Sequence, residues 1–198
     1  MTLRFSCLLL VPWLAAAQGT LIYDQQSSTN EIPDGYGDGT TLQQYVSYLQ
    51  SFTPTNSSMD FVRLKLNDKF ASSGVGATLH VNIRSTAYNG PILGSSLSVV
   101  LPNAFTGVTN FVFASPVSLS PGSTYFLEPI VESGDLWNTA AGEYNYSGGM
   151  VFANGIAAPG SDMWFREGVI VPEPSSALLL VVGGCAVLYA WRRRNWIG

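Results

Sequence analysis

The chain has 198 residues, of which 46% are hydrophobic and 11% are charged, and its formal net charge is −4. An average soluble domain carries about 25% charged residues, so most of the polar surface of this protein must consist of uncharged side chains. Between residues 18 and 170 the acidic residues outnumber the basic ones, and no basic patch can form there. We therefore expect no nucleic-acid partner.

Residues 1–17 have the three parts of a secretory signal peptide. Arg4 precedes a short apolar run, and the small residues Ala15 and Ala17 provide a site for signal peptidase before Gln18. A first transmembrane helix is the alternative, but the run is too short to cross about 30 Å of hydrocarbon. We expect signal peptidase to remove residues 1–17 and the mature chain to begin at Gln18.

The segment 18–170 alternates apolar and polar residues with the period of β-strands. We expect strands over residues 20–23, 44–52, 60–66, 77–84, 97–101, 109–113, 124–131, 149–153 and 163–170. Clusters of turn-forming residues separate them, at residues 33–39, 72–76, 89–94, 120–122 and 155–161. With about nine short strands and no helical pattern, the sequence predicts an all-β domain, an antiparallel β-sandwich or jelly roll.

The loop over residues 30–39 concentrates glycines and acids, with carboxylates at Glu31, Asp34 and Asp38. Calcium prefers about six to eight oxygen ligands, and an acidic, glycine-rich loop can supply several of them. The spacing differs from that of an EF-hand, so a solvated loop is the first interpretation and a calcium site is the alternative. We expect no other cofactor and no other metal.

The single histidine, His80, lies at an outward position of the strand expected over residues 77–84. A Ser-His-Asp relay requires a serine in front of the imidazole and a buried carboxylate behind it, and the chain has no GxSxG nucleophile motif. We expect a solvated strand position and assign no catalytic residue.

Two tryptophans of this segment, Trp137 and Trp164, lie near the acidic residues Asp135, Glu143 and Asp162 in the sequence. Aromatic rings beside carboxylates can form a sugar-binding rim, and two carboxylates about 5–10 Å apart can hydrolyse a glycoside. The third interpretation makes both tryptophans packing residues of the core or of a sheet edge. We expect packing first, ligand binding as the alternative, and no enzymatic activity.

The segment 18–170 contains no cysteine, because Cys7 lies in the signal peptide and Cys185 in a C-terminal apolar run. A disulfide, a thiolate zinc site and a cysteine nucleophile are therefore excluded for this domain. A domain of about 150 residues can bury a sufficient core without a disulfide.

Three features follow one another in residues 171–198. They are a Pro-Glu-Pro motif (Pro172, Glu173 and Pro174), an apolar run (177–191) and an arginine cluster (Arg192, Arg193 and Arg194). The run gives about 22 Å of helix, and interfacial aromatic residues and local bilayer thinning make up the difference from about 30 Å. We expect one transmembrane helix, with the arginines as its cytoplasmic stop. The segment 18–170 then lies outside, as the signal peptide also demands.

This succession at the C-terminus resembles the PEP-CTERM sorting signal of Gram-negative, exopolysaccharide-producing bacteria. The resemblance implies recognition by an exosortase, a membrane-embedded transpeptidase, and removal of the helix near the motif. Pro172, Glu173 and Pro174 are then the recognition residues. The two prolines restrict φ and favour an extended strip outside the bilayer, where a membrane enzyme can bind it. An ordinary tail anchor is the alternative.

Several parts of the remaining chain form a second resemblance. They are residues 61–66, 79–83, 89–91, 119–127, 137, 146–149 and 164–166. Together they resemble the exported ectodomains called choice-of-anchor domains, in particular the R type, which implies a small β-sandwich without established catalytic residues. With the tail, this implies a non-enzymatic cell-surface or matrix protein linked to exopolysaccharide. A carbohydrate-binding module of the envelope, assisted by calcium, is the alternative.

Overall fold

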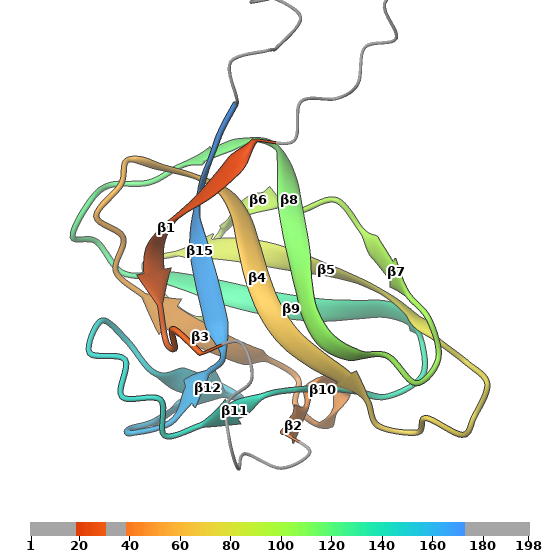
Figure 1. Ribbon diagram of the computed structural model, residues 1–198. Helices are drawn as coiled ribbons and strands as arrows, with labels where there is room; N and C mark the ends of the chain where they lie inside the picture. Colours follow the sequence, from red (N-terminus) through yellow and green to blue (C-terminus); the bar gives the residue numbers. More distant parts are fainter. Residues whose placement is uncertain (1–18, 31–38, 173–198) are drawn as a thin grey trace, which may run out of the picture. The chain divides into compact units, whose positions relative to one another are not determined.

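The computed structural model describes residues 19–30 and 39–172, and this part of the chain is built from β-strands (Figure 1). The chain divides into two compact units, one of residues 21–170 and the other of the two terminal segments. The first unit contains nearly all described residues.

Several predicted features lie outside the described residues. They are the signal peptide (1–17), the acidic loop with Asp34 and Asp38, and the transmembrane helix (177–191). Within the part of the chain that the structure describes, no helix has the length and apolar character needed to span a membrane.

The first of two large sheets has the strand order β1-β15-β4-β10-β2, and β8 also pairs with β4. These strands are β1 (Thr20–Gln26), β15 (Phe165–Val171), β4 (Ser58–Asp68), β10 (Trp137–Thr139), β2 (Thr40–Thr41) and β8 (Thr106–Ser118). Strand β4 pairs antiparallel with β8, β15 and β10. It is therefore the central strand of this sheet.

The second large sheet has the order β13-β12-β3-β9-β5-β6, and β7 also pairs with β5. Its strands are β13 (Ile156–Ala158), β12 (Val151–Ala153), β3 (Tyr48–Phe52), β9 (Tyr125–Gly134), β5 (Ala77–Ser85), β6 (Ile92–Ser95) and β7 (Val99–Leu101). A short ribbon of β11 (Ala141–Gly142) and β14 (Asp162–Met163) and the 3-10 helix η1 (Leu42–Gln44) complete the described elements.

The hydrophobic core lies between the two large sheets. In Figure 1, β4, β8 and β15 run steeply across β5 and β9. Alternate residues of β4 and β5 supply fully buried side chains, namely Val62, Leu64, Leu66, Leu79, Val81 and Ile83. Phe52 of β3 and Phe165 of β15 contact each other from opposite sheets, with ring centroids 6.4 Å apart. The predicted all-β, antiparallel sandwich is confirmed.

One edge of the sandwich is closed by the chain between β6 and β7. The Ser96 N–H donates to the Val81 carbonyl of the second sheet at 2.9 Å, and the Leu97 N–H donates to the Val112 carbonyl of the first sheet at 2.8 Å. Ser96 also forms an isolated antiparallel bridge with Phe113. A short segment therefore satisfies backbone groups of both sheets, which leaves fewer edge groups unpaired at this side.

The strand predicted over residues 44–52 begins later, at Tyr48. The 3-10 helix η1 precedes it, and Val46 between the two is 100% exposed. The Val46 N–H donates to the side chain of Asn154 at 2.8 Å instead of to a neighbouring strand. The ladder therefore starts only after this residue.

Strand β6 overlaps the turn cluster predicted at residues 89–94, and β13 lies inside the one predicted at residues 155–161, so that part of the prediction was wrong. Both are edge strands whose apolar side chains, such as Ile92 and Ile156, are exposed, and they lack the contrast between two faces that marks a strand in the sequence. Asn154 and Gly155, with φ of 51° and 77°, form the two-residue turn between β12 and β13. Asn and Gly tolerate these left-handed conformations.

Truncating a core side chain of β4 should destabilise the sandwich. Leu64→Ala removes a side chain that is 0% exposed, and we expect the free energy of unfolding to fall by about 2–5 kcal/mol. Urea unfolding of the intact chain in detergent, followed by circular dichroism, measures this. The matched control is Val100→Ala on β7, a residue 77% exposed, which should change stability by about 0.5 kcal/mol or less. Equal losses in both variants would contradict the placement of the core.

Candidate functional site

Both tryptophans of the described residues lie in the interior, each with 0% of its surface exposed. Trp137 packs against Phe105, with ring centroids 6.2 Å apart. The indole N–H of Trp164 donates to the Asn30 carbonyl at 2.9 Å. A sugar ring needs exposed aromatic surface for stacking, and neither residue offers any. The expectation that both tryptophans are packing residues is therefore confirmed, and the alternative of a ligand-binding rim at Trp137 and Trp164 is wrong.

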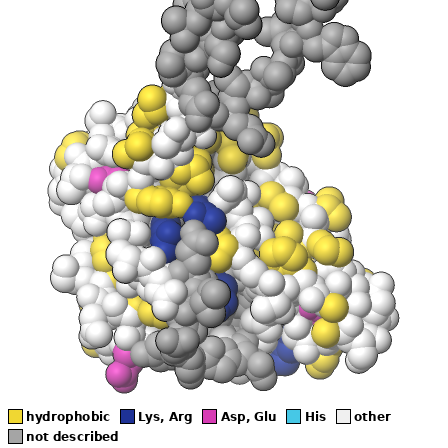
Figure 2. All heavy atoms as spheres, in the orientation of Figure 1, with side chains coloured by type: hydrophobic (Ala, Val, Ile, Leu, Met, Phe, Trp, Pro, Cys, Tyr) yellow, Lys and Arg dark blue, Asp and Glu magenta, His cyan; other side chains and the backbone are white. Residues whose placement is uncertain are grey.

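Trp164 belongs to a stacked cluster outside the main core. The Arg166 guanidinium lies 5.1 Å from the Trp164 ring centroid and 5.2 Å from that of Tyr23. The Arg63 guanidinium lies 5.9 Å from the Tyr23 centroid and also donates to the Tyr23 hydroxyl. On the face shown in Figure 2, the basic side chains form a small group among hydrophobic and uncharged ones. Cation–π contacts of this kind stabilise aromatic rings that the two-sheet core does not enclose.

The three acids near the tryptophans in the sequence have different environments. Asp162 is 2% exposed, and its two oxygens accept hydrogen bonds from the Gln50 side chain at 3.0 Å and from the Tyr146 N–H at 2.9 Å. Asp135 accepts a hydrogen bond from the N–H of the next residue, and Glu143 is exposed. Both oxygens of Asp162 are engaged in holding distant segments together, which is a structural use of the carboxylate.

His80 has a partner that the sequence did not reveal. Its Nδ1 lies 2.6 Å from Oε1 of Glu132, and the Ser98 hydroxyl donates to the same oxygen at 2.6 Å. Hydrogen bonds from Ser98 and then from His80 lower the pKa of Glu132. The carboxylate lies between the hydroxyl and the imidazole, whereas a nucleophilic relay places the imidazole between the other two groups. The cluster therefore joins β5, β9 and the segment before β7 at the surface.

Within residues 19–30 and 39–172, no group of three or more His, Cys, Asp or Glu side chains could hold a metal ion. Asp34 and Asp38 lie outside the described residues. The calcium hypothesis for the acidic loop therefore stays a prediction.

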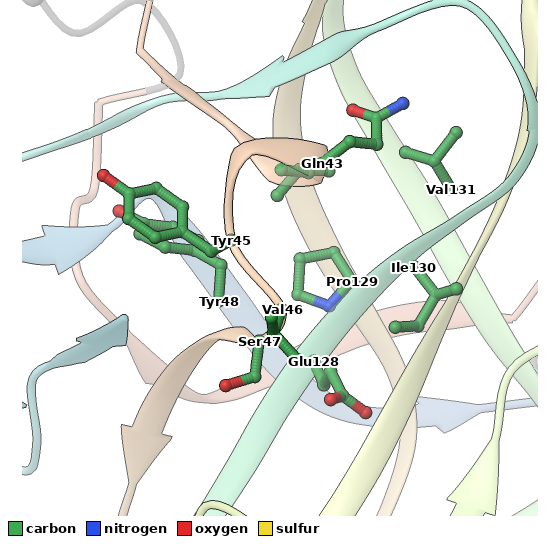
Figure 3. A pocket seen from close by; sticks show the side chains of 10 residues that line it. Gln43, Tyr45, Val46, Ser47, Tyr48, Glu128, Pro129, Ile130 and Val131 are labelled. Carbon is green, nitrogen blue, oxygen red and sulfur yellow. The ribbon is translucent and has the colours of Figure 1, made fainter. Parts of the chain in front are cut away.

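A depression of about 130 Å³ lies between the chain from η1 to β3 and strand β9 (Figure 3). The rings of Tyr45 and Tyr48 stack at its border, with centroids 5.4 Å apart and planes at 28°. The Glu128 carboxylate is 5% exposed and accepts hydrogen bonds from Arg84 at 2.8 Å and Asn82 at 3.2 Å. The depression thus combines a half-exposed aromatic ring with an acid that is already ion-paired.

Strand β15, the last strand before the Pro-Glu-Pro motif, lies between β1 and β4. The Ser27 N–H donates to the Phe165 carbonyl and the Phe165 N–H donates to the Ser27 hydroxyl, both at 3.0 Å. Further along, Gly168 approaches β1 so closely that a Cβ atom would lie 1.9 Å from the Ile22 carbonyl oxygen. The pairing of Ser27 with Phe165 and the approach of Ile22 to Gly168 show that β1 and β15 run antiparallel. The domain therefore ends at the same end of this strand pair at which it begins (Figure 1).

A side chain holds the end of β15 where its pairing with β4 stops. The two strands pair from Phe165 to Gly168, and beyond this the Asp60 carboxylate accepts the Ile170 N–H at 2.8 Å. Asp60 lies at a register shift of β4 against β8, and such bulges redirect side chains. Pro172 is two residues after Ile170 and has no N–H with which to extend a ladder. The Pro-Glu-Pro motif therefore begins directly where the sandwich ends.

Glu167 of β15 is a buried acid that was not predicted from the sequence. It is 0% exposed, and its carboxyl lies beside the Gln25 N–H and the Asp24 carboxylate of β1. Burial, reinforced by the nearby Asp24 carboxylate, raises the pKa of Glu167 to about 8. The side chain is therefore uncharged at neutral pH. Glu167 lies two residues after Phe165 and therefore on the same, core-facing side of the strand. The alternation of side chains along a strand could have predicted this position.

Asp24 of β1 has the opposite environment. Its carboxylate accepts the N–H groups of Thr55 at 2.8 Å and Asn56 at 2.9 Å, and also the Thr55 hydroxyl. Burial opposes its ionisation, but these hydrogen bonds outweigh that effect and lower the pKa of Asp24. The first and last strands therefore carry one ionised and one neutral acid near each other.

The fold and its exit strand together define an all-β domain that is followed without a spacer by a C-terminal motif. Residues 171–194 match the family model of the PEP-CTERM protein-sorting motif, so the chain carries this sorting signal and the predicted resemblance is confirmed. The signal implies an exported protein that an exosortase sorts at the cell envelope. Comparisons of the chain with curated proteins and with solved structures found no match.

Of the sorting-signal residues named above, Pro172 belongs to the described residues. Glu173 and Pro174 and the cluster of Arg192, Arg193 and Arg194 lie outside them, as do Ala15, Ala17 and Gln18 of the predicted signal-peptidase site. The membrane-stop role of the arginines, the signal-peptidase site and the likeness to a choice-of-anchor domain stay predictions.

Replacing Glu167 with glutamine should change stability in a pH-dependent way. Below about pH 4.5 the carboxyl is protonated in the folded and unfolded chains alike. Between about pH 4.5 and 8 the unfolded chain loses this proton while the folded chain keeps it, so wild-type stability falls as the pH rises. Relative to wild type, Glu167→Gln should therefore gain on the order of 3 kcal/mol on going from pH 4.5 to pH 8.5.

Urea unfolding of both proteins across this pH range measures the difference. Glu143→Gln, an exposed acid of the same domain, serves as the control and should show a far smaller pH-dependent gain. A stability difference for Glu167→Gln that stays constant from pH 4.5 to 8.5 would contradict the neutral state of Glu167.

Proposed function

We propose that this chain is an exported, non-enzymatic protein of the cell surface or extracellular matrix. An exosortase sorts and processes it through Pro172, Glu173 and Pro174, and the ectodomain then resides at the envelope or in exopolysaccharide. The observation that carries the proposal is the match of residues 171–194 to the sorting motif, placed directly after the last strand of a sandwich.

The environments of the candidate catalytic groups support a structural role for the ectodomain. Both oxygens of Asp162 accept structural hydrogen bonds, and His80 and Ser98 share one oxygen of Glu132. The absence of a nucleophile–base–acid order among these residues favours a protein that acts by being displayed. A surface built mainly from uncharged polar groups also suits contact with hydrated polysaccharide.

Replacing Pro172, Glu173 and Pro174 together with alanine should block processing. We expect the wild-type protein from its native host to lack the helix and arginines, because the enzyme removes the chain near the motif. The triple variant should retain residues 175–198, while removal of the signal peptide stays unchanged. Intact mass spectrometry of both proteins distinguishes these forms.

Pro159→Ala, an exposed proline of the ectodomain, is the matched control and should be processed like wild type. If all wild-type molecules retained residues 175–198 in a host with an active exosortase, the proposed processing would be refuted.

A carbohydrate-binding module is the second candidate function. The specific observation in its favour is the half-exposed Tyr45 ring, stacked on Tyr48 at the border of the depression beside β9. Aromatic rings of this kind provide the apolar face on which a sugar ring packs. Since Trp137 and Trp164 are buried, this role would depend on Tyr45 and on any calcium held by the acidic loop.

This alternative predicts measurable heat of binding in a calorimetric titration with purified host exopolysaccharide, with and without calcium. Tyr45→Ala should weaken that binding by about tenfold or less, and Tyr88→Ala, another surface tyrosine, should not. The leading proposal of a displayed structural protein is favoured over the alternative if millimolar sugar produces no heat of binding.

A further inference from the structure

The end of β15 is held by a contact that ordinary sheet pairing does not provide. Pairing with β4 stops at Gly168, and the next bond on this side runs from the Ile170 N–H to the Asp60 carboxylate at 2.8 Å. Asp60 is half-buried at the bulge of β4, where it has no partner residue on β8. The bulge thus frees the side chain of Asp60 to act as an acceptor for a different strand.

This bond lies close to the sorting motif along the chain. The backbone nitrogens of Ile170 and Pro172 are two residue steps apart, which is at most about 7 Å along an extended chain. Val171, the last residue of β15, is therefore the single residue between the Asp60 bond and the motif. An enzyme that cleaves a peptide generally binds several residues of it in extended form. While the Asp60–Ile170 bond is closed, Val171 is the one residue between this bond and Pro172 that the enzyme could bind.

We propose that Asp60 is a positioning residue for the sorting reaction. Together with the pairing of β15 to β1, its bond to Ile170 keeps the chain before the motif in the sheet, and the exosortase engages the motif fully only after this bond opens. The inference rests on the proposed function, because it presupposes that an exosortase acts at Pro172, Glu173 and Pro174. It adds that the fold limits how fast the enzyme does so.

Two substitutions and one insertion test this. Asp60→Ala removes the acceptor, Asp60→Asn keeps a weaker neutral acceptor, and a Gly-Ser insertion between Val171 and Pro172 lengthens the free segment with Asp60 intact. Pulse-chase labelling of the full chain in its native host, with the loss of residues 175–198 as readout, gives the rate of processing. A hydrogen bond to a charged group is strong enough for its loss to raise this rate by about tenfold.

We expect the rate to rise from wild type to Asp60→Asn to Asp60→Ala, and to rise in the insertion variant. In the insertion background, Asp60→Ala should add little, because the free segment is already long enough. General destabilisation of the sandwich would instead multiply the rate in both backgrounds, so the double-variant comparison separates positioning from stability. The controls are Glu143→Gln and a Gly-Ser insertion between Gly122 and Ser123, in an exposed turn.

Each other outcome refutes the inference. Equal rates in all variants, a slower rate in Asp60→Ala, or independent effects of Asp60→Ala and the insertion would show that the Ile170 bond does not control access. Failure of the proposed function looks different, since wild type itself would then keep residues 175–198 in every molecule.

Discussion

Strand β15 lies between β1 and β4, and it joins the two ends of the domain sequence within one sheet. Its residue Phe165 bonds to Ser27 across a separation of 138 residues. Closing so long a loop is entropically unfavourable until packing compensates for it, and non-local pairings of this kind slow folding. Phe165 also supplies part of that packing through its contact with Phe52 of the facing sheet. The first sheet is therefore complete only when the residues directly before the sorting motif are in place.

The low charge of the chain shapes how its polar interior is satisfied. Four aspartates accept backbone N–H groups at points where strands end, turn or bulge, namely Asp24, Asp60, Asp68 and Asp162. A carboxylate that accepts an amide hydrogen satisfies a backbone group that would otherwise be buried without a partner. Glu167 differs because burial and the neighbouring Asp24 carboxylate outweigh the hydrogen bond from the Gln25 N–H. Its neutral state at physiological pH is the physical consequence of that burial.

The success of prediction from the sequence depended on how local each signal was. The core strands β4 and β5 were predicted because one face of each is fully buried, whereas the edge strands β6 and β13 lack that contrast. The sorting signal was recognised because its parts are adjacent in the chain. The pairs His80–Glu132 and Asp60–Ile170 are 52 and 110 residues apart, and neither local sequence marks its partner. The burial of Trp164 was expected, but its contact with Arg166 was not, because a single aromatic residue has no periodicity that marks its partner.

The sorting signal consists of residues that are adjacent in the chain, whereas the sandwich depends on contacts between distant residues. The two adjoin in the chain directly after Ile170. The signal is a short run of residues that an enzyme can recognise one after another, and its family match accordingly begins at residue 171. The sandwich consists of contacts between distant residues, and its last side-chain contact before that run is the bond from Asp60 to Ile170. A local signal is independent of the fold only when a flexible spacer separates the two. Because Val171 is both the last residue of β15 and the first residue of the family match, the recognition of the signal and the stability of the last strand are physically coupled.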